Sequence, residues 1–122
     1  MTDPNFTLLY VKNPQASAEF YARLLGKPAI EASPTFAMFA LASGTMLGLW
    51  ASHTVEPAAT APGGSEIAFS VDNAAQVDER HAAWQGMGLT IAQSPVAMDF
   101  GHTFVALDPD GHRLRVFAPG AA

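Results

Sequence analysis

The sequence predicts an α+β fold of two tandem βαβββ modules, and three observations support this. Strand-like runs that end in Val-x-Asn recur sixty residues apart, over 6–13 and 66–73. Each run precedes a helix-like segment that is closed by a glycine. A second pair of strand-like runs, 45–51 and 112–118, recurs sixty-seven residues apart, each after a glycine. Because such a repeat implies two similar units with facing sheets, we expect a cup-shaped mixed sheet that encloses a cleft.

The first module is predicted at about residues 4–51. Its first strand covers 5–11, whose apolar residues are typical of a buried strand. Asn13 and Pro14 begin a helix, because asparagine caps free backbone N–H groups and proline fits the first helical position. Gly26 ends this helix. Three further strands are predicted at about 28–32, 35–42 and 45–51.

The second module is predicted at about residues 65–119, after a linker over 52–64 that is rich in Pro, Gly and Ala. It begins with a strand at 65–71. Asn73 then caps a helix, with Gln76 three residues later as in a capping box. Strands follow at about 89–97, 102–107 and 112–118, the last two joined by a tight turn over 108–111. We expect the two modules to form a single domain over residues 1–122.

Composition excludes several classes of function. The chain has 122 residues, of which 49% are hydrophobic, so it can form a packed globular domain. It has no cysteine, which excludes disulfides, a thiolate nucleophile and a Cys-based zinc site. A net charge of −5 with only six Lys and Arg offers little to nucleic acid. The sequence shows neither a signal peptide nor a membrane-length apolar run, so we expect a cytoplasmic protein without nucleic-acid or membrane partners.

Alternation along the strands predicts which side chains line the cleft. Successive side chains of a strand point to opposite faces, and one face of each half-sheet must carry its helix. In the first strand Leu9 and Val11 suit the helix side, and the repeat extends this assignment to the other strands. The predicted lining is mainly aromatic, with one carboxylate and two guanidiniums: Phe6, Tyr10, Phe36, Met38, Trp50, Glu66, Thr103, Arg113, Arg115 and Phe117.

Several motifs, in this order and with the repeat, resemble the vicinal oxygen chelate superfamily of glyoxalases, extradiol dioxygenases and bleomycin-binding resistance proteins. They are Val11-Lys-Asn-Pro, Glu19-Phe-Tyr-Ala-Arg-Leu-Leu-Gly26 and Asp108-Pro-Asp-Gly-His-Arg-Leu-Arg115. Within the superfamily, Leu47-Gly-Leu-Trp50 and Phe100-Gly-His-Thr-Phe104 are similar to phenazine-antibiotic resistance proteins. The resemblance implies the tandem βαβββ fold. It also implies a homodimer in which each cleft combines halves of two chains.

The resemblance also bears on metal binding. Enzymes of the superfamily hold a divalent metal with His and Glu at one position in each of four strands, and these positions correspond to Phe6, Gly48, Glu66 and Arg115. Only Glu66 could be a ligand, and Arg115 would repel a cation. We therefore expect no metal and no cofactor. The resemblance then implies a protein that sequesters a small molecule without altering it.

Three functions of different classes stay open. The leading one is non-catalytic binding of a small planar aromatic molecule, an aromatic acid being the class that stacking on Trp50 and a carboxylate contact to Arg113 or Arg115 suggest. The alternative is a glyoxalase- or dioxygenase-type enzyme (lyase, isomerase or transferase) with an unrecognised metal site, or with Glu66 as a general base of raised pKa. The third is an interaction module whose cleft its own side chains fill. For Glu66 and Arg115 the simpler interpretation is a salt bridge.

Overall fold

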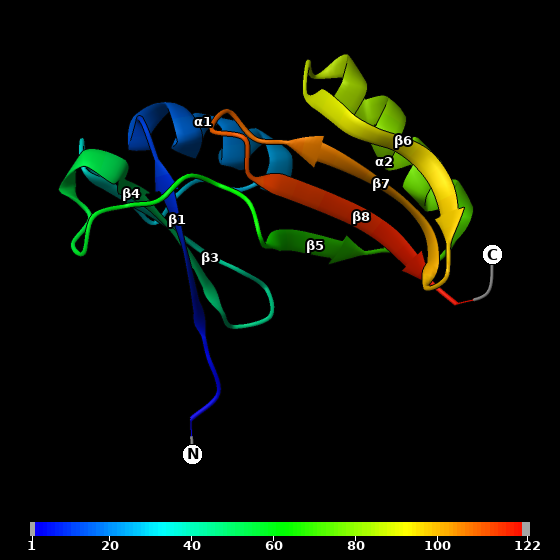
Figure 1. Ribbon diagram of the computed structural model, residues 1–122, viewed down its shortest axis with the longest axis horizontal. Coiled ribbons are helices and arrows are strands. Elements are labelled where there is room, and N and C mark those ends of the chain that lie inside the picture. Colours follow the sequence, from blue (N-terminus) through cyan, green and yellow to red (C-terminus); the bar gives the residue numbers. More distant parts are fainter. Residues whose placement is uncertain (1, 121–122) are drawn as a thin grey trace. The chain divides into compact units, whose positions relative to one another are not determined.

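The computed structural model describes residues 2–120, which divide into two compact units between Ala61 and Pro62 (Figure 1). Each unit contains a four-stranded mixed sheet and one long helix. The α+β class and the tandem βαβββ modules are therefore confirmed. The single domain over residues 1–122 and the joining of both sheets into one cup stay predictions.

Unit 1 is the first βαβββ module. Its elements are β1 (Phe6–Val11), α1 (Pro14–Leu25), β2 (Glu31–Ala32), β3 (Phe36–Ala40) and β4 (Met46–Ala51), followed by a 3-10 turn (Ser52–Thr54). The strand order is β1-β4-β3-β2, with β1 parallel to β4 and the other pairs antiparallel. The sheet therefore has β1 at one edge.

Unit 2 repeats this plan. Its elements are β5 (Glu66–Ser70), α2 (Ala74–Gly86), β6 (Thr90–Met98), β7 (Gly101–Leu107) and β8 (Arg113–Pro119). The strand order is β5-β8-β7-β6, again with the first strand parallel to the last. The sequence repeat thus corresponds to a repeat of topology. Over residues 2–120, neither helix is long and apolar enough to cross a membrane.

Both helices begin as the sequence predicts. The Asn13 side chain accepts hydrogen bonds from the backbone N–H groups of the second and third helical residues, with Pro14 at the first position. The Asn73 side chain accepts from the N–H of Gln76, whose own side chain accepts from the N–H of Asp72. The C-terminal ends differ. Gly26 follows α1 in the left-handed region at φ +71°, whereas Gly86 is still helical and α2 is followed by a left-handed Gly88.

The predicted strand at 28–32 shortens to Glu31–Ala32 in the structure. Pro28 has no backbone N–H to donate to a sheet, which limits pairing at this end. The predicted linker is also partly ordered onto unit 1, because the 3-10 turn over Ser52–Thr54 is followed by the buried Val55. Local composition indicates where a chain turns, but packing decides how many residues pair.

Each sheet carries its helix on one face. In unit 1, α1 contacts β3 and β4, and the buried residues on this side include Leu9, Phe39 and Leu49. In unit 2, α2 contacts β6, β7 and β8, where the Trp84 ring meets Phe104 edge to face at 5.5 Å. The residues between these buried positions point to the opposite, open face of each sheet. The open faces carry the side chains that the alternation predicted.

Candidate functional site

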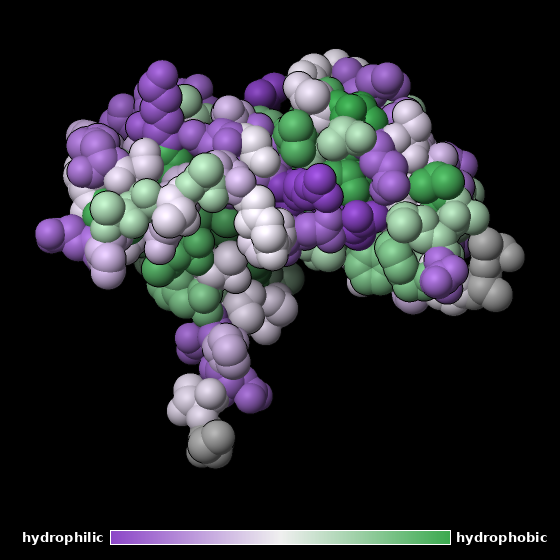
Figure 2. Space-filling model, viewed as in Figure 1, coloured by the Kyte–Doolittle hydropathy of each residue, from purple (hydrophilic) through white to green (hydrophobic). Residues whose placement is uncertain are grey.

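The open face of unit 1 contains an apolar pocket of about 470 Å³, lined by Phe6, Leu8, Phe36 and Trp50. We call it the aromatic pocket. Its lining comes from β1, β3 and β4, and Phe36 lies directly opposite Trp50 in the sheet. Phe6 and Leu8 are 43% and 46% exposed, which is unusual for large apolar side chains. Figure 2 shows apolar surface over β1 and β3 of this unit.

A glycine lies beneath three of the side chains that line the aromatic pocket. Gly48 lies in the central strand β4, beside Leu8 of β1. A Cβ atom at this position would lie 2.7 Å from Leu8 Cδ2, 2.8 Å from Phe6 Cε1 and 3.0 Å from Phe36 Cζ. The side chains of the pocket therefore close over the backbone of Gly48 to an extent that a larger residue would prevent.

Two other predicted residues share this face without lining the pocket. Tyr10 lies opposite Trp50 in the β1–β4 pairing, and the two rings are in edge-to-face contact at 6.4 Å. Met38 lies opposite Gly48 in the β3–β4 pairing and is half-buried. The structure thus brings the five predicted residues of unit 1 onto one open sheet face.

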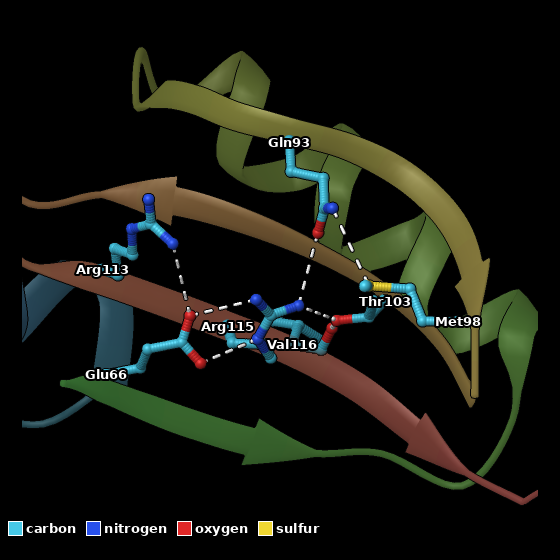
Figure 3. Close-up of polar contacts among 7 residues, drawn as sticks. All are labelled: Glu66, Gln93, Met98, Thr103, Arg113, Arg115 and Val116. Atoms are coloured by element: carbon cyan, nitrogen blue, oxygen red, sulfur yellow. Dashed lines mark hydrogen bonds and ion pairs between the residues drawn. The ribbon is translucent and has the colours of Figure 1, made fainter. Parts of the chain in front are cut away.

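In unit 2 the open face carries a polar network around Arg115 (Figure 3). Its guanidinium donates to Glu66 through Nε (2.8 Å) and Nη2 (3.0 Å), and through Nη1 to Gln93 Oε1 (3.3 Å) and Thr103 Oγ1 (3.1 Å). We call these four residues the Arg115 cluster. One member comes from each of β5, β6, β7 and β8. The predicted salt bridge between Glu66 and Arg115 is present.

The charge of Glu66 follows from this geometry. Its hydrogen bond from Arg115 lowers the pKa of the carboxyl below its ordinary value, and the charges of Arg115 and Arg113 act in the same direction against the effect of burial. A carboxylate of lowered pKa is a weak proton acceptor at neutral pH. The pKa of Glu66 is therefore shifted in the direction opposite to the one that the enzyme alternative requires.

Arg113 differs from Arg115 although both point to the same face of β8. It is the direct neighbour of Glu66 in the β5–β8 pairing, yet its Nη1 atom lies 4.0 Å from Glu66 Oε2. Its side chain is 58% exposed, against 16% for Arg115. It borders a pocket of about 630 Å³ that is also lined by Gly63, Gly64, Ser65, Glu66 and Ala68. Arg113 is the guanidinium that solvent and solutes can reach more readily.

Sequence reasoning missed Gln93 and Phe100. The pairing of β6 with β7 is irregular on both sides of Gln93, so counting alternate residues along this strand does not show which side chains face Arg115. Phe100 lies between β6 and β7, where its ring contacts that of Phe117 edge to face at 6.0 Å. The Arg115 guanidinium carbon lies 5.6 Å from the Phe100 ring centre. The sequence did contain one indication of Phe100 as a site residue, because it is an aromatic residue shortly before the start of a predicted strand.

The residues at the four metal-ligand positions do not fit a divalent metal. Phe6 and Gly48 have no donor atoms in their side chains, and both Glu66 oxygens accept hydrogen bonds from Arg115. Within residues 2–120 there is no group of three or more His, Asp or Glu side chains that could hold a metal ion. Divalent sites require several converging oxygen or nitrogen donors. In unit 2, Glu66 and Arg115 form an ion pair instead.

Two βαβββ units of one topology, each with an open sheet face, define the fold class of the vicinal oxygen chelate proteins. Residues 4–116 match the Glyoxalase/Bleomycin resistance protein/Dioxygenase superfamily, and the chain belongs to this superfamily. It is 31% identical over 116 residues to the phenazine antibiotic resistance protein EhpR of Enterobacter agglomerans, covering 93% of this chain and 89% of that protein. The predicted resemblance is thereby confirmed.

Solved structures agree with this assignment. The chain is 56% identical to protein ATC0852 from Agrobacterium tumefaciens, whose solution NMR structure superposes with a TM-score of 0.91 over 99% of this chain and 100% of that one. A glyoxalase-related enzyme from Fulvimarina pelagi is 20% identical with a TM-score of 0.84, covering 97% of this chain and 88% of that one. The second likeness is one of fold alone.

Proposed function

We propose that this protein binds a small planar aromatic molecule of the phenazine type and sequesters it without chemical change. The observation that carries this proposal is the aromatic pocket, where three aromatic side chains and Leu8 surround an open apolar volume of about 470 Å³. Planar rings bind such surfaces by stacking and by apolar burial. The phenazine type comes from the similarity to the resistance protein EhpR.

Binding without chemistry is supported by the side chains themselves. The four residues of the aromatic pocket carry no titratable or nucleophilic group. In unit 2 the carboxylate of Glu66 is held by two hydrogen bonds from Arg115 and is a poor base. A site of this composition can exclude water from a ring and hold it, but it offers no acid–base pair for a reaction.

The charge of the ligand is a separate part of the proposal. Four N–H groups of Arg115 donate to protein oxygens, so little hydrogen-bonding capacity is left for a ligand. Arg113 is more exposed and only loosely paired with Glu66. Within unit 2, a carboxylate group would therefore be bound by Arg113 rather than by Arg115.

Isothermal titration calorimetry with phenazine and phenazine-1-carboxylate tests the proposal. Trp50→Ala should weaken both compounds about 30-fold, because loss of a buried aromatic anchor costs about 2 kcal/mol. The control is Ile30→Ala, which removes an apolar side chain that is 59% exposed and outside the pocket. It should bind as the parent does. Mass spectrometry of the released compound should show it unchanged.

Two results would contradict the proposal. One is an equal dissociation constant for the parent and Trp50→Ala with both compounds. The other is conversion of the compound during incubation with the parent.

A further inference from the structure

The Arg115 cluster has the arrangement of a cation site that is filled from within the chain. Four oxygen atoms converge on one positive group: both carboxylate oxygens of Glu66, Gln93 Oε1 and Thr103 Oγ1, at 2.8 to 3.3 Å. The four oxygen atoms come from strands β5, β6 and β7, and the positive group comes from β8 (Figure 3). We propose that the Arg115 guanidinium acts as a tethered cation in an oxygen-lined site that would take a free guanidinium ion if the side chain were removed.

The two neutral oxygens are oriented toward the cation by their other contacts. The Thr103 hydroxyl donates its proton to the backbone carbonyl of Val116 at 2.8 Å, so its lone pairs are available to Arg115. The Gln93 amide directs its nitrogen to the sulfur of Met98 at 3.8 Å and its oxygen to Arg115. Thr103 is buried. These second contacts would persist without the guanidinium, so the oxygens would still point into the vacated space.

The surroundings explain why a guanidinium is suited to this site. The Phe100 ring lies 5.6 Å from the guanidinium carbon, and the Arg115 side chain is largely shielded from water. A shielded charge needs a partner, and the planar fork of arginine matches the two oxygens of Glu66. The irregular pairing of β6 places Gln93 where it completes the set. Arg113, two residues away on the same face, has none of this enclosure and is the natural control.

The test is chemical rescue of Arg115→Ala, followed by thermal unfolding. Removal of the guanidinium leaves Glu66 and two polar side chains without their partner, so the melting temperature should fall by about 10 °C. Guanidinium chloride at tens of millimolar should raise the melting temperature of this variant by several degrees relative to sodium chloride at equal concentration. It should not stabilise the parent or Arg113→Ala, and Arg113→Ala should melt within about 2 °C of the parent.

Equal melting temperatures for Arg115→Ala and the parent would overturn the proposal. So would an equal response of Arg115→Ala and Arg113→Ala to guanidinium. If Arg115→Ala does not fold, Arg115→Lys replaces it, because lysine keeps the charge and loses the planar fork. Arg115→Lys should fold and melt below the parent, and a melting temperature equal to that of the parent would also count against the proposal. The aromatic pocket belongs to unit 1 and contains no member of the Arg115 cluster, so failure here leaves the proposed binding of an aromatic molecule standing.

Discussion

Replacement of Gly48 by alanine should reshape the aromatic pocket while unit 1 stays folded. The new Cβ atom would lie 2.7 Å from Leu8 Cδ2, 2.8 Å from Phe6 Cε1 and 3.0 Å from Phe36 Cζ. Ordinary contacts begin at 3.4 Å, so these atoms must retreat by between 0.4 Å (3.4 − 3.0) and 0.7 Å (3.4 − 2.7). All three are ends of side chains on the open face of the sheet, where they can rotate away.

Opposing effects on stability should nearly cancel in this variant. Alanine in place of glycine within a strand gains about 0.5–1 kcal/mol, because the unfolded chain has less freedom to lose. Overpacking in a closed core costs about 1–3 kcal/mol, and the cost is smaller where the displaced groups are exposed. We expect the free energy of unfolding to change by less than about 1 kcal/mol. Affinity for phenazine should fall about tenfold, since three of the four pocket residues move.

Urea unfolding and calorimetric titration of the same preparations measure both quantities. Gly44→Ala is the matched control, because Gly44 has φ +93° and no atom within 4 Å of its added Cβ. It should lose about 1–2 kcal/mol of stability through backbone strain and bind phenazine as the parent does. Unchanged affinity of Gly48→Ala would refute the reasoning. A loss of more than about 3 kcal/mol would also do so, because it would place these side chains in a rigid core.

Two further predictions concern charge and assembly. Glu66 has a lowered pKa in the folded state, so its contribution to stability is present above its unfolded value near 4.5 and is lost as the pH falls through the folded pKa. The stability difference between the parent and Glu66→Gln, measured by urea unfolding, should therefore shrink between pH 6 and pH 3, and a constant difference would show that the carboxylate is not linked to folding. Light scattering at micromolar concentration should give the mass of two chains, because the edge strand β1 exposes Phe6, Leu8 and Tyr10. A mass of one chain would contradict this.

Local features of the sequence determined the secondary structure and the faces of most strands. Asn13 with Pro14, and Asn73, mark the helix starts because capping is decided by neighbouring residues. The alternation along β1, β4 and β8 placed Trp50 and Arg115 on open faces, since regular strands have a period of two. The repeat indicated that the two units share one topology, because each copy carries the same order of elements. Helix starts and strand faces require only short-range information, whereas the repeat is found by comparing segments sixty residues apart.

Only the tertiary structure decided how the charged residues are used. Arg113 and Arg115 have the same parity on β8, so alternation alone does not distinguish them, and only the resemblance singled out Arg115 as the partner of Glu66. In the folded sheet Arg113 is exposed, whereas Arg115 lies against Glu66 and Thr103. Gln93 joins them through an irregular pairing of β6, which no counting rule reveals. The packing over Gly48 likewise depends on side chains from two other strands, β1 and β3, that meet above the backbone of β4. Distances between strands are set by the whole fold, so the partners of a side chain across a sheet could not be predicted from its own segment.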